Sequence, residues 1–454
     1  MAPVPTGLRS RDAHRGFRLL LFGLVIVTLS GFGPWVPAHR GPTLPGPPWA
    51  GPSDHGAGAM AALSPGPGPS AVSTRDANGA PALPESPPPA SIEASAPRIP
   101  AVPVGSYPEM AVVDTTSGLV YVINDGSNNV SVINGSHVVA TLAVGMTPVP
   151  AVYDSADGYV YVPNYNSDNV SVLNGTSVVA SVRLASNPYN AAYDPGDGEV
   201  YIPEFSGSVV AVLNGTKLVA SVTVGSGPQS AAYDAANGYL YIPNWNSNTV
   251  SILNGTRVIA TPGVGVNPES PVYDPASGYI YVTNDGGSSV SVLNGTQVIA
   301  TISVGSYPVG GTYDPADGFV YVPNELSNSV SVLNGTRLLR TVGAGGEPET
   351  AEYDAGDGNL YVPDFSSNNV TVLNDARVVR SVSVGVGPYS AAYDGTNGIL
   401  YVSNTDSNNV SLLSTWNTVT FSEMGLPNGT LWRVNTSRVD SPVTNGSSVT
   451  IPAP

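Results

Sequence analysis

The stretch Tyr161-Val162-Pro163-Asn164 returns along the chain at steps of 40 residues, without a slip in the spacing. Its tyrosine recurs at eight positions, which are Tyr121, Tyr161, Tyr201, Tyr241, Tyr281, Tyr321, Tyr361 and Tyr401. A repeat of this length cannot bury both of its faces alone, so its copies must stack against one another. The sequence therefore predicts one repeat architecture over most of the chain.

Each repeat contains four short segments with strand character, separated by turn-forming residues. In the third copy these segments are 188–194, 198–203, 209–214 and 218–225. The Asn-Gly pair between the third and fourth segments favours a type I′ hairpin, because both central residues then need positive φ. No copy shows helical periodicity. Four antiparallel strands per repeat predict the blades of an all-β β-propeller.

The number of blades follows from the number of segments. The first, second and third segments occur eight times, whereas the fourth occurs seven times and is replaced after Val410 by Ser414-Thr415-Trp416-Asn417. Upstream of the first blade, 98–105 aligns in step with the fourth segment at 138–145. We therefore expect this N-terminal segment to be the outer strand of the last blade and to close an eight-bladed ring, which removes the free sheet edges.

These residues resemble the YVTN family of β-propeller repeats, which is common in archaeal and bacterial surface-layer and exported proteins. The resemblance covers 98–415 and rests on Tyr281-Val-Thr-Asn284, Asn169-Val-Ser-Val-Leu173, 298–305 and 308–318. Seven blades are more usual in the family than eight. Its members share no single activity, so the resemblance implies a fold and a cell-surface setting but no set of catalytic residues.

The regions on either side of the repeats differ from them in composition. Basic residues precede an uncharged stretch at 19–38, which is typical of a secretory signal peptide or of an uncleaved membrane anchor, so 1–38 is expected to be one of these. The Pro-, Ala-, Gly- and Ser-rich segment 39–97 predicts a disordered spacer. Residues 416–454 look like the opening strands of an immunoglobulin-like module, too short for a complete sandwich. Both N-terminal interpretations place the repeats outside the cell.

Composition argues against several classes of function. The net charge is −17 and Lys217 is the only lysine, which disfavours nucleic acid as a partner. Cysteine is absent, which excludes disulfides and thiolate chemistry. His137 is the only histidine within the repeats, so neither a Ser–His–Asp triad nor a zinc site can be assembled there. We expect no enzyme activity, no metal and no cofactor.

The repeated aspartate at the first turn has two interpretations. Asp154 and Asp157, followed by Gly158, are compatible with a calcium loop, but such a loop needs more carboxylates per turn. The favoured interpretation is that the aspartate bonds its own backbone and the glycine adopts the left-handed conformation.

Thirteen Asn-x-Ser/Thr sequons are present in the sequence. Six lie in the Asn-Gly hairpins, at Asn134, Asn174, Asn214, Asn254, Asn294 and Asn334. Hairpin chemistry alone accounts for them, and it is compatible with glycosylation at exposed turns of an exported protein.

Positions that differ between copies are candidates for ligand contact. One position just after the second segment varies in this way and is occupied in turn by Asp125, Tyr165, Phe205, Trp245, Asp285, Glu325, Phe365 and Thr405. The loop entering the first segment also varies, and strand direction places both loops at the same end of the propeller. Aromatic rings beside carboxylates and amides suit glycans, so we predict a site made of Tyr165, Phe205, Trp245, Phe365, Gln229 and Glu269. The alternative is that these residues vary because they lie on a surface loop where the identity of the side chain matters little.

Together these features predict a non-enzymatic cell-surface propeller that serves as a structural or adhesive interaction module. Its expected partners are other cell-surface proteins or glycans, and it would contact a membrane only through an uncleaved 1–38. The alternative is an extracytoplasmic propeller enzyme of the lyase or quinone-dependent dehydrogenase type.

Overall fold

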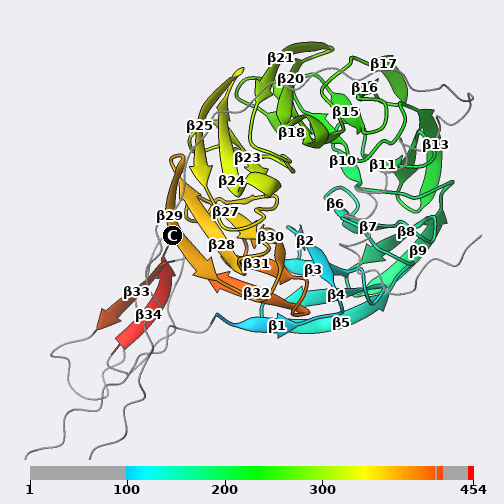
Figure 1. The fold of residues 1–454 in the computed structure, drawn as a ribbon. Coiled ribbons are helices and arrows are strands. Elements are labelled where there is room, and N and C mark those ends of the chain that lie inside the picture. Colours follow the sequence, from blue (N-terminus) through cyan, green and yellow to red (C-terminus); the bar gives the residue numbers. More distant parts are fainter. Residues whose placement is uncertain (1–98, 415–416, 423–447, 454) are drawn as a thin grey trace, which may run out of the picture. The chain divides into compact units, whose positions relative to one another are not determined.

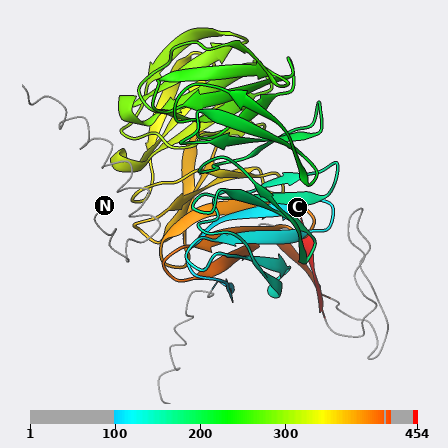
Figure 2. The same ribbon diagram turned by 90° about the vertical axis from the view of Figure 1, so that its right-hand side faces the viewer.

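The computed structural model describes residues 99–414, 417–422 and 448–453. Within these residues it contains eight four-stranded antiparallel sheets, the blades, and one two-stranded sheet. The blades form a ring, seen along its axis in Figure 1 and from the side in Figure 2. The predicted signal or anchor segment 1–38, the spacer 39–97 and most of the tail 416–454 lie outside the described residues. No helix in the described part of the chain has the length and apolar character needed to cross a membrane.

Each blade follows one strand order, from an inner strand beside the axis to an outer strand at the rim (Figure 1). Blade 1 consists of β2 (Pro108–Asp114), β3 (Leu119–Asn124), β4 (Asn129–Asn134) and β5 (His137–Ala143). The strands of blades 2 to 4 are β6 (Val152–Asp154), β7 (Tyr159–Asn164), β8 (Asn169–Asn174), β9 (Ser177–Arg183), β10 (Ala192–Asp194), β11 (Glu199–Glu204), β12 (Val209–Asn214), β13 (Lys217–Thr223), β14 (Ala232–Asp234), β15 (Tyr239–Asn244), β16 (Thr249–Asn254) and β17 (Arg257–Ala260).

The remaining blades repeat this order, and blade 8 takes its outer strand from the N-terminal side. Blades 5 to 7 contain β18 (Pro268–Asp274), β19 (Tyr279–Asn284), β20 (Ser289–Asn294), β21 (Gln297–Ser303), β22 (Thr312–Asp314), β23 (Phe319–Asn324), β24 (Ser329–Asn334), β25 (Arg337–Gly343), β26 (Glu352–Asp354), β27 (Asn359–Asp364), β28 (Asn369–Asn374) and β29 (Arg377–Ser383). Blade 8 contains β30 (Pro388–Asp394), β31 (Ile399–Asn404), β32 (Asn409–Ser414) and β1 (Ala101–Pro103). The short 3-10 helices η1 (Asp285–Gly287) and η2 (Glu325–Ser327) follow β19 and β23, and β33 (Asn417–Ser422) pairs with β34 (Ser448–Ala453).

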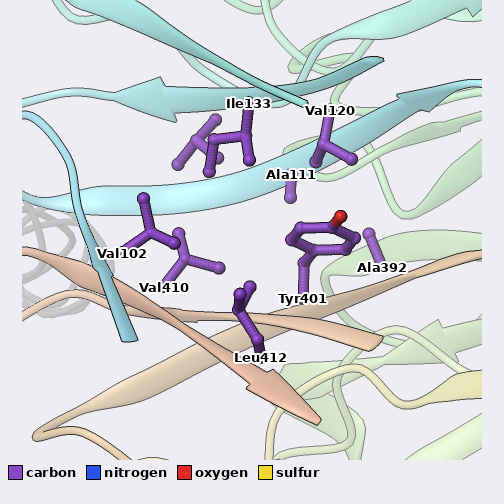
Figure 3. Packing of buried hydrophobic residues seen from close by; sticks show 9 residues of the cluster. Val102, Ala111, Val120, Ile133, Ala392, Tyr401, Val410 and Leu412 are labelled. Atoms are coloured by element: carbon purple, nitrogen blue, oxygen red, sulfur yellow. The ribbon is translucent and has the colours of Figure 1, made fainter. Parts of the chain in front are cut away.

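The ring is closed by β1, as the count of segments predicts. Val102 of β1 pairs with Val410 of β32, and the Leu412 amide donates to the Pro100 carbonyl at 2.8 Å. Val102 is buried, and it packs in one cluster with Val410 and with Ile133 of blade 1 (Figure 3). The closing strand therefore belongs both to the last sheet and to the core between the last and first blades.

The core lies between neighbouring blades, because each apolar cluster draws on two of them. Tyr161 and Val170 of blade 2, for example, pack with Val200 and Leu213 of blade 3. The middle strands are apolar on both faces because both faces are covered by adjacent blades. The eight repeated tyrosines are at most 1% exposed. They are the largest fully buried side chains and fill the spaces between sheets.

The tyrosine hydroxyls bond in two different ways. Those of Tyr161, Tyr201, Tyr321 and Tyr361 donate to an aspartate of their own first turn. Those of Tyr121, Tyr241 and Tyr401 donate to a glycine carbonyl in the outer hairpin of another blade. The Tyr401 hydroxyl reaches Gly135 O of blade 1 at 2.9 Å and so bridges the closure of the ring.

The first turn has the geometry expected from its aspartate and glycine. Asp154 Oδ1 accepts from the Ala156 amide at 2.8 Å, and the Asp154 carbonyl accepts from the Gly158 amide at 3.0 Å. Gly158 has φ +76°, in the left-handed region that favours glycine. The turn interpretation of the repeated aspartate is confirmed.

The predicted type I′ turn at the Asn-Gly hairpins is wrong. Asn134 pairs with His137, so the two central residues are Gly135 and Ser136 rather than Asn134 and Gly135. Gly135 has positive φ and Ser136 does not, which are the φ signs of a type II′ turn. The residue after the turn joins the outer strand one position earlier than the hydrophobic pattern indicates, and this shifts the turn. Only blade 7, where Asp375 and Ala376 both have positive φ, shows the type I′ signs.

Candidate functional site

The two loops that differ most between copies lie at one end of the propeller, which we call the variable face. It comprises the residues that follow the second strand of each blade and the loops that enter the first strand. The Tyr165 amide donates to the Thr147 carbonyl at 2.9 Å, and the Trp245 amide donates to the Gly227 carbonyl at 2.8 Å. The same backbone bond joins Phe365 to Glu347 at 3.0 Å. A constant backbone thus carries side chains of different chemistry.

The loop after the second strand of each blade ends in a left-handed residue, and in six of the eight blades the side chain of this residue ties neighbouring blades together on this face. Asn128 has φ +53°, and its Oδ1 accepts from the Thr147 amide of the next blade at 2.8 Å. Asn248 and Asn328 form the same bond to the amides of Asn267 and Glu347. Asparagine tolerates this backbone conformation better than most residues, which is the signal that the sequence offered. These bonds hold the loops of the variable face in place.

Phe205 and Trp245, two of the predicted contact residues, contact each other across blades 3 and 4. Their ring centroids are 6.5 Å apart, and the rings are 7% and 4% exposed. The Trp245 Nε1 group donates to Asp285 Oδ2 of blade 5 at 3.4 Å. Three successive blades are therefore linked through equivalent positions. Because both rings are buried, little of their surface is open to a ligand in this conformation.

Tyr165 and Phe365 are more accessible, since each is only partly buried. The Tyr165 ring meets the edge of Tyr189 on the third blade, with the centroids 6.0 Å apart. Burial raises the pKa of the Tyr165 hydroxyl. Phe365 lies on blade 7, beside Gly387, where a Cβ would come within 3.0 Å of the ring. Of the four predicted rings, Tyr165 and Phe365 are thus partly exposed, whereas Phe205 and Trp245 are buried.

Gln229 and Glu269 lie where the inner strands of blades 4 and 5 begin. The Gln229 amide donates to the Pro243 carbonyl at 3.2 Å, and its side chain is 8% exposed. Its Oε1 atom has no hydrogen-bond partner among the described residues. The adjacent Ser230 hydroxyl donates to the Glu269 carbonyl at 2.5 Å and joins the two blades. Other buried side-chain oxygens of the described residues, such as Asn164 Oδ1 and Asn244 Oδ1, lack a partner in the same way, so this feature alone does not mark a ligand site.

Glu352, on the inner strand β26, is not among the residues predicted from the sequence. Every equivalent position holds a small or β-branched residue, namely Val112, Val152, Ala192, Ala232, Val272, Thr312 and Ala392. Glu352 Oε1 accepts from the Tyr393 amide of blade 8 at 3.2 Å. Burial raises the pKa of this carboxyl to about 7, despite the opposing effect of that hydrogen bond. The sequence could have identified Glu352, because a glutamate stands where every other repeat has a small or β-branched residue.

A second unusual carboxyl is Asp364, which replaces the repeated asparagine of the second strand in blade 7. It is fully buried, and burial raises its pKa to about 6. The Thr371 hydroxyl donates to Asp364 Oδ2 at 2.7 Å. Across the described residues, no group of three His, Asp or Glu side chains is placed to hold a metal ion.

No family model matches the chain, and no curated protein sequence matches it. The likenesses are to solved structures. The dihydro-heme d1 dehydrogenase NirN, in complex with DHE, matches with a TM-score of 0.56 at 16% identity, covering 72% of this chain and 79% of that one. The virginiamycin B lyase of Staphylococcus aureus gives 0.50 at 14%, covering 59% and 94%.

The hydrazine synthase of Kuenenia stuttgartiensis gives 0.49 at 17% identity, covering 71% of this chain and 99% of that one. Likenesses at these identities concern the fold alone. Residues 99–414 form an eight-bladed β-propeller closed by an N-terminal strand.

Proposed function

We propose that the protein is a YVTN-type cell-surface β-propeller that acts as a non-enzymatic structural or adhesive interaction module and binds glycans through its variable face. The residues that differ between copies are gathered at one end, on loops held by the same backbone bonds in each blade. This observation carries the proposal, because a fixed scaffold with varied side chains is suited to recognition. The basic and apolar pattern at 1–38 and the spacer at 39–97 support export and display.

The contacts that we assign to the ligand follow from exposure. Tyr165, supported at its edge by Tyr189, offers a ring for stacking on a sugar face, and Phe365 offers another on blade 7. Phe205 and Trp245 lie beneath the surface and support the loops. Gln229 is buried to the same degree as these two rings, so its Oε1 atom is not assigned as a ligand contact in this conformation.

The ligand proposal is tested on a glycan array. Wild type should bind a defined set of glycans, and Tyr165→Ala should lose that binding. Tyr159→Ala is the matched control, because Tyr159 is a partly buried tyrosine of the same blade but is the first residue of β7, whereas Tyr165 follows the last residue of that strand. No binding by wild type, or equal loss in both variants, would contradict glycan recognition at this face.

The cell-surface location is tested separately. Protease added to intact cells should digest the protein at the rate seen for a known surface protein, while a cytoplasmic marker stays intact. Protection of the protein under these conditions would overturn the proposed location.

Glu352 favours a second candidate, an extracytoplasmic propeller enzyme. A carboxyl with a pKa of about 7 is suited to proton transfer at neutral pH, since it exchanges a proton readily there. A substrate screen that found turnover abolished by Glu352→Gln, in a variant that binds glycans normally, would establish this candidate. The absence of any such turnover would leave Glu352 with a structural role.

A further inference from the structure

The ten sequons in the propeller fall into two structural classes. In six of them the asparagine is the last residue of a third strand and is exposed, at Asn134, Asn174, Asn214, Asn254, Asn294 and Asn334. The residue with the hydroxyl, two positions later, lies in the turn and is exposed or partly exposed. None of these six side-chain amides makes a hydrogen bond within the described residues. Both groups that define the sequon are thus available on the folded protein.

The other four sequons begin third strands, at Asn129, Asn169, Asn369 and Asn409. Their hydroxyl residues point into the core: Ser171 is 2% exposed, and its Oγ accepts from Asn164 Nδ2 at 3.1 Å. Asn169 Nδ2 itself donates to Ser181 Oγ at 2.7 Å. An enzyme that must reach both the amide and the hydroxyl cannot use these sequons once the blade has folded.

The outer strands next to five of the six exposed asparagines expose large apolar side chains, whereas Val258 and Ile259 of blade 4 are partly buried. Pairs of neighbouring residues such as Val138 and Val139, or Leu338 and Leu339, are between 37% and 52% exposed. Asn134 pairs with His137, directly before the first of these residues, so a group attached to Asn134 lies beside the pair. Outer strands also leave backbone groups unpaired at their free edge, and an apolar free edge is prone to association with other chains.

The two blades without a hairpin sequon have other protection at this edge. In blade 7 the turn reads Asn374-Asp375-Ala376, and the outer strand carries Arg377 and Arg380. In blade 8 the outer strand ends at Pro103 and is preceded by Pro100. Charged residues and prolines are the usual means of blocking an edge strand. Blade 6 has both a sequon and two arginines.

We propose that the six hairpin asparagines carry N-linked glycans and that these glycans cover the apolar outer edges of blades 1 to 6. The donor is a lipid-phosphate-linked oligosaccharide, and a cellular transferase catalyses the step. The asparagine amide nitrogen forms a bond to the anomeric carbon, while the bond from that carbon to the phosphate oxygen breaks. The nitrogen gives up one proton to the transferase, and the lipid phosphate leaves. This inference rests on the proposed export but not on glycan binding at the variable face.

Glycopeptide mapping of the protein purified from the cells that make it tests the sites. A glycan mass is expected on each of the six hairpin peptides and on none of the peptides that contain Asn129, Asn169, Asn369 or Asn409. If surface digestion shows that the protein is exported and the hairpin peptides carry no glycan, the proposal is wrong. This outcome does not depend on the result of the glycan array. Glycans on peptides of both classes would show that the folded structure does not determine which sequons are modified.

The covering role is tested with a variant in which the hairpin Ser or Thr of all six sequons is changed to Ala. These side chains lie at exposed or partly exposed turns, so the variant should keep its far-UV circular dichroism spectrum. It is expected to lose all six glycans, to bind more hydrophobic dye and to aggregate faster. Adding Val139→Thr and Leu339→Thr should reverse part of that gain in dye binding. Dye binding equal to that of the parent would overturn the role of the glycans as a cover.

Discussion

Tyr401 and Tyr241 allow the closed ring to be tested with a matched pair of variants. Each hydroxyl accepts a bond from an asparagine of its own turn, Asn397 at 3.0 Å and Asn237 at 3.1 Å. Each also donates to a hairpin glycine carbonyl of another blade, at 2.9 Å for Tyr401 and 3.1 Å for Tyr241. The two sites differ in one respect, because the Tyr401 bond crosses from blade 8 to blade 1.

Replacing either tyrosine with phenylalanine keeps the buried ring and removes both hydrogen bonds. At about 1 kcal/mol for each bond, Tyr241→Phe should lower the free energy of unfolding by about 2 kcal/mol. In a closed ring Tyr401→Phe should cost the same amount. Urea unfolding followed by circular dichroism gives both values, from the midpoint and slope of each curve. A loss of about 1 kcal/mol or less for Tyr401→Phe, beside the full loss for Tyr241→Phe, would refute closure in solution.

Three further predictions use the same fold. Deleting 97–104 removes β1 and exposes the Val410 side of blade 8, so the melting temperature should fall and aggregation should rise; a deletion variant as stable as the parent would show that β1 does not close the ring. Gly145→Ala places a Cβ about 2.7 Å from Asn164 Cβ and should lower the free energy of unfolding by about 1–3 kcal/mol. Gly263→Ala, whose Cβ would have no atom within 4 Å, should leave it almost unchanged. Equal effects of the two variants in urea unfolding would contradict the close approach at Gly145. The pKa of the Glu352 carboxyl is raised in the folded state, so its contribution to stability is full below the pKa that it has in the unfolded chain and is lost as the pH rises to about 7. The free energy of unfolding of the parent should therefore fall by about 1–3 kcal/mol from pH 4.5 to pH 8 relative to that of Glu352→Gln. Parallel pH profiles of the two proteins would show that the carboxyl is not buried in solution.

The repeat predicted the fold because its evidence is cumulative. Eight copies of a tyrosine, an aspartate and a glycine at a constant step allow few architectures, and the missing fourth segment identified the closing strand. Local patterns were less reliable within a blade. The first segment predicts a full strand at 188–194, but β10 spans only Ala192–Asp194, and Pro188 makes an isolated bridge to Glu204.

The candidate site was harder to predict, because it depends on contacts between repeats. Phe205 and Trp245 stand at positions that vary, and the sequence gives no sign that each covers its neighbour. Their burial results from the approach of adjacent blades, which no single repeat encodes. The sequence shows that Glu352 differs from the residues at the equivalent position of the other repeats. The rise in its pKa, however, depends on the surrounding blades. Variation between copies therefore indicated the face more reliably than the individual contacts.

The closing strand also decides how the propeller responds to mechanical load. Ala101 pairs with Ser411 and Pro103 with Asn409, so the chain enters β1 at the same end of the sheet at which it leaves β32. Tension applied between these two points loads the pairs one after another, as in unzipping, rather than all together, as in shear. A short strand pulled in this direction yields at low force. Under tension between these points the ring would open at this seam while the other blades stay folded.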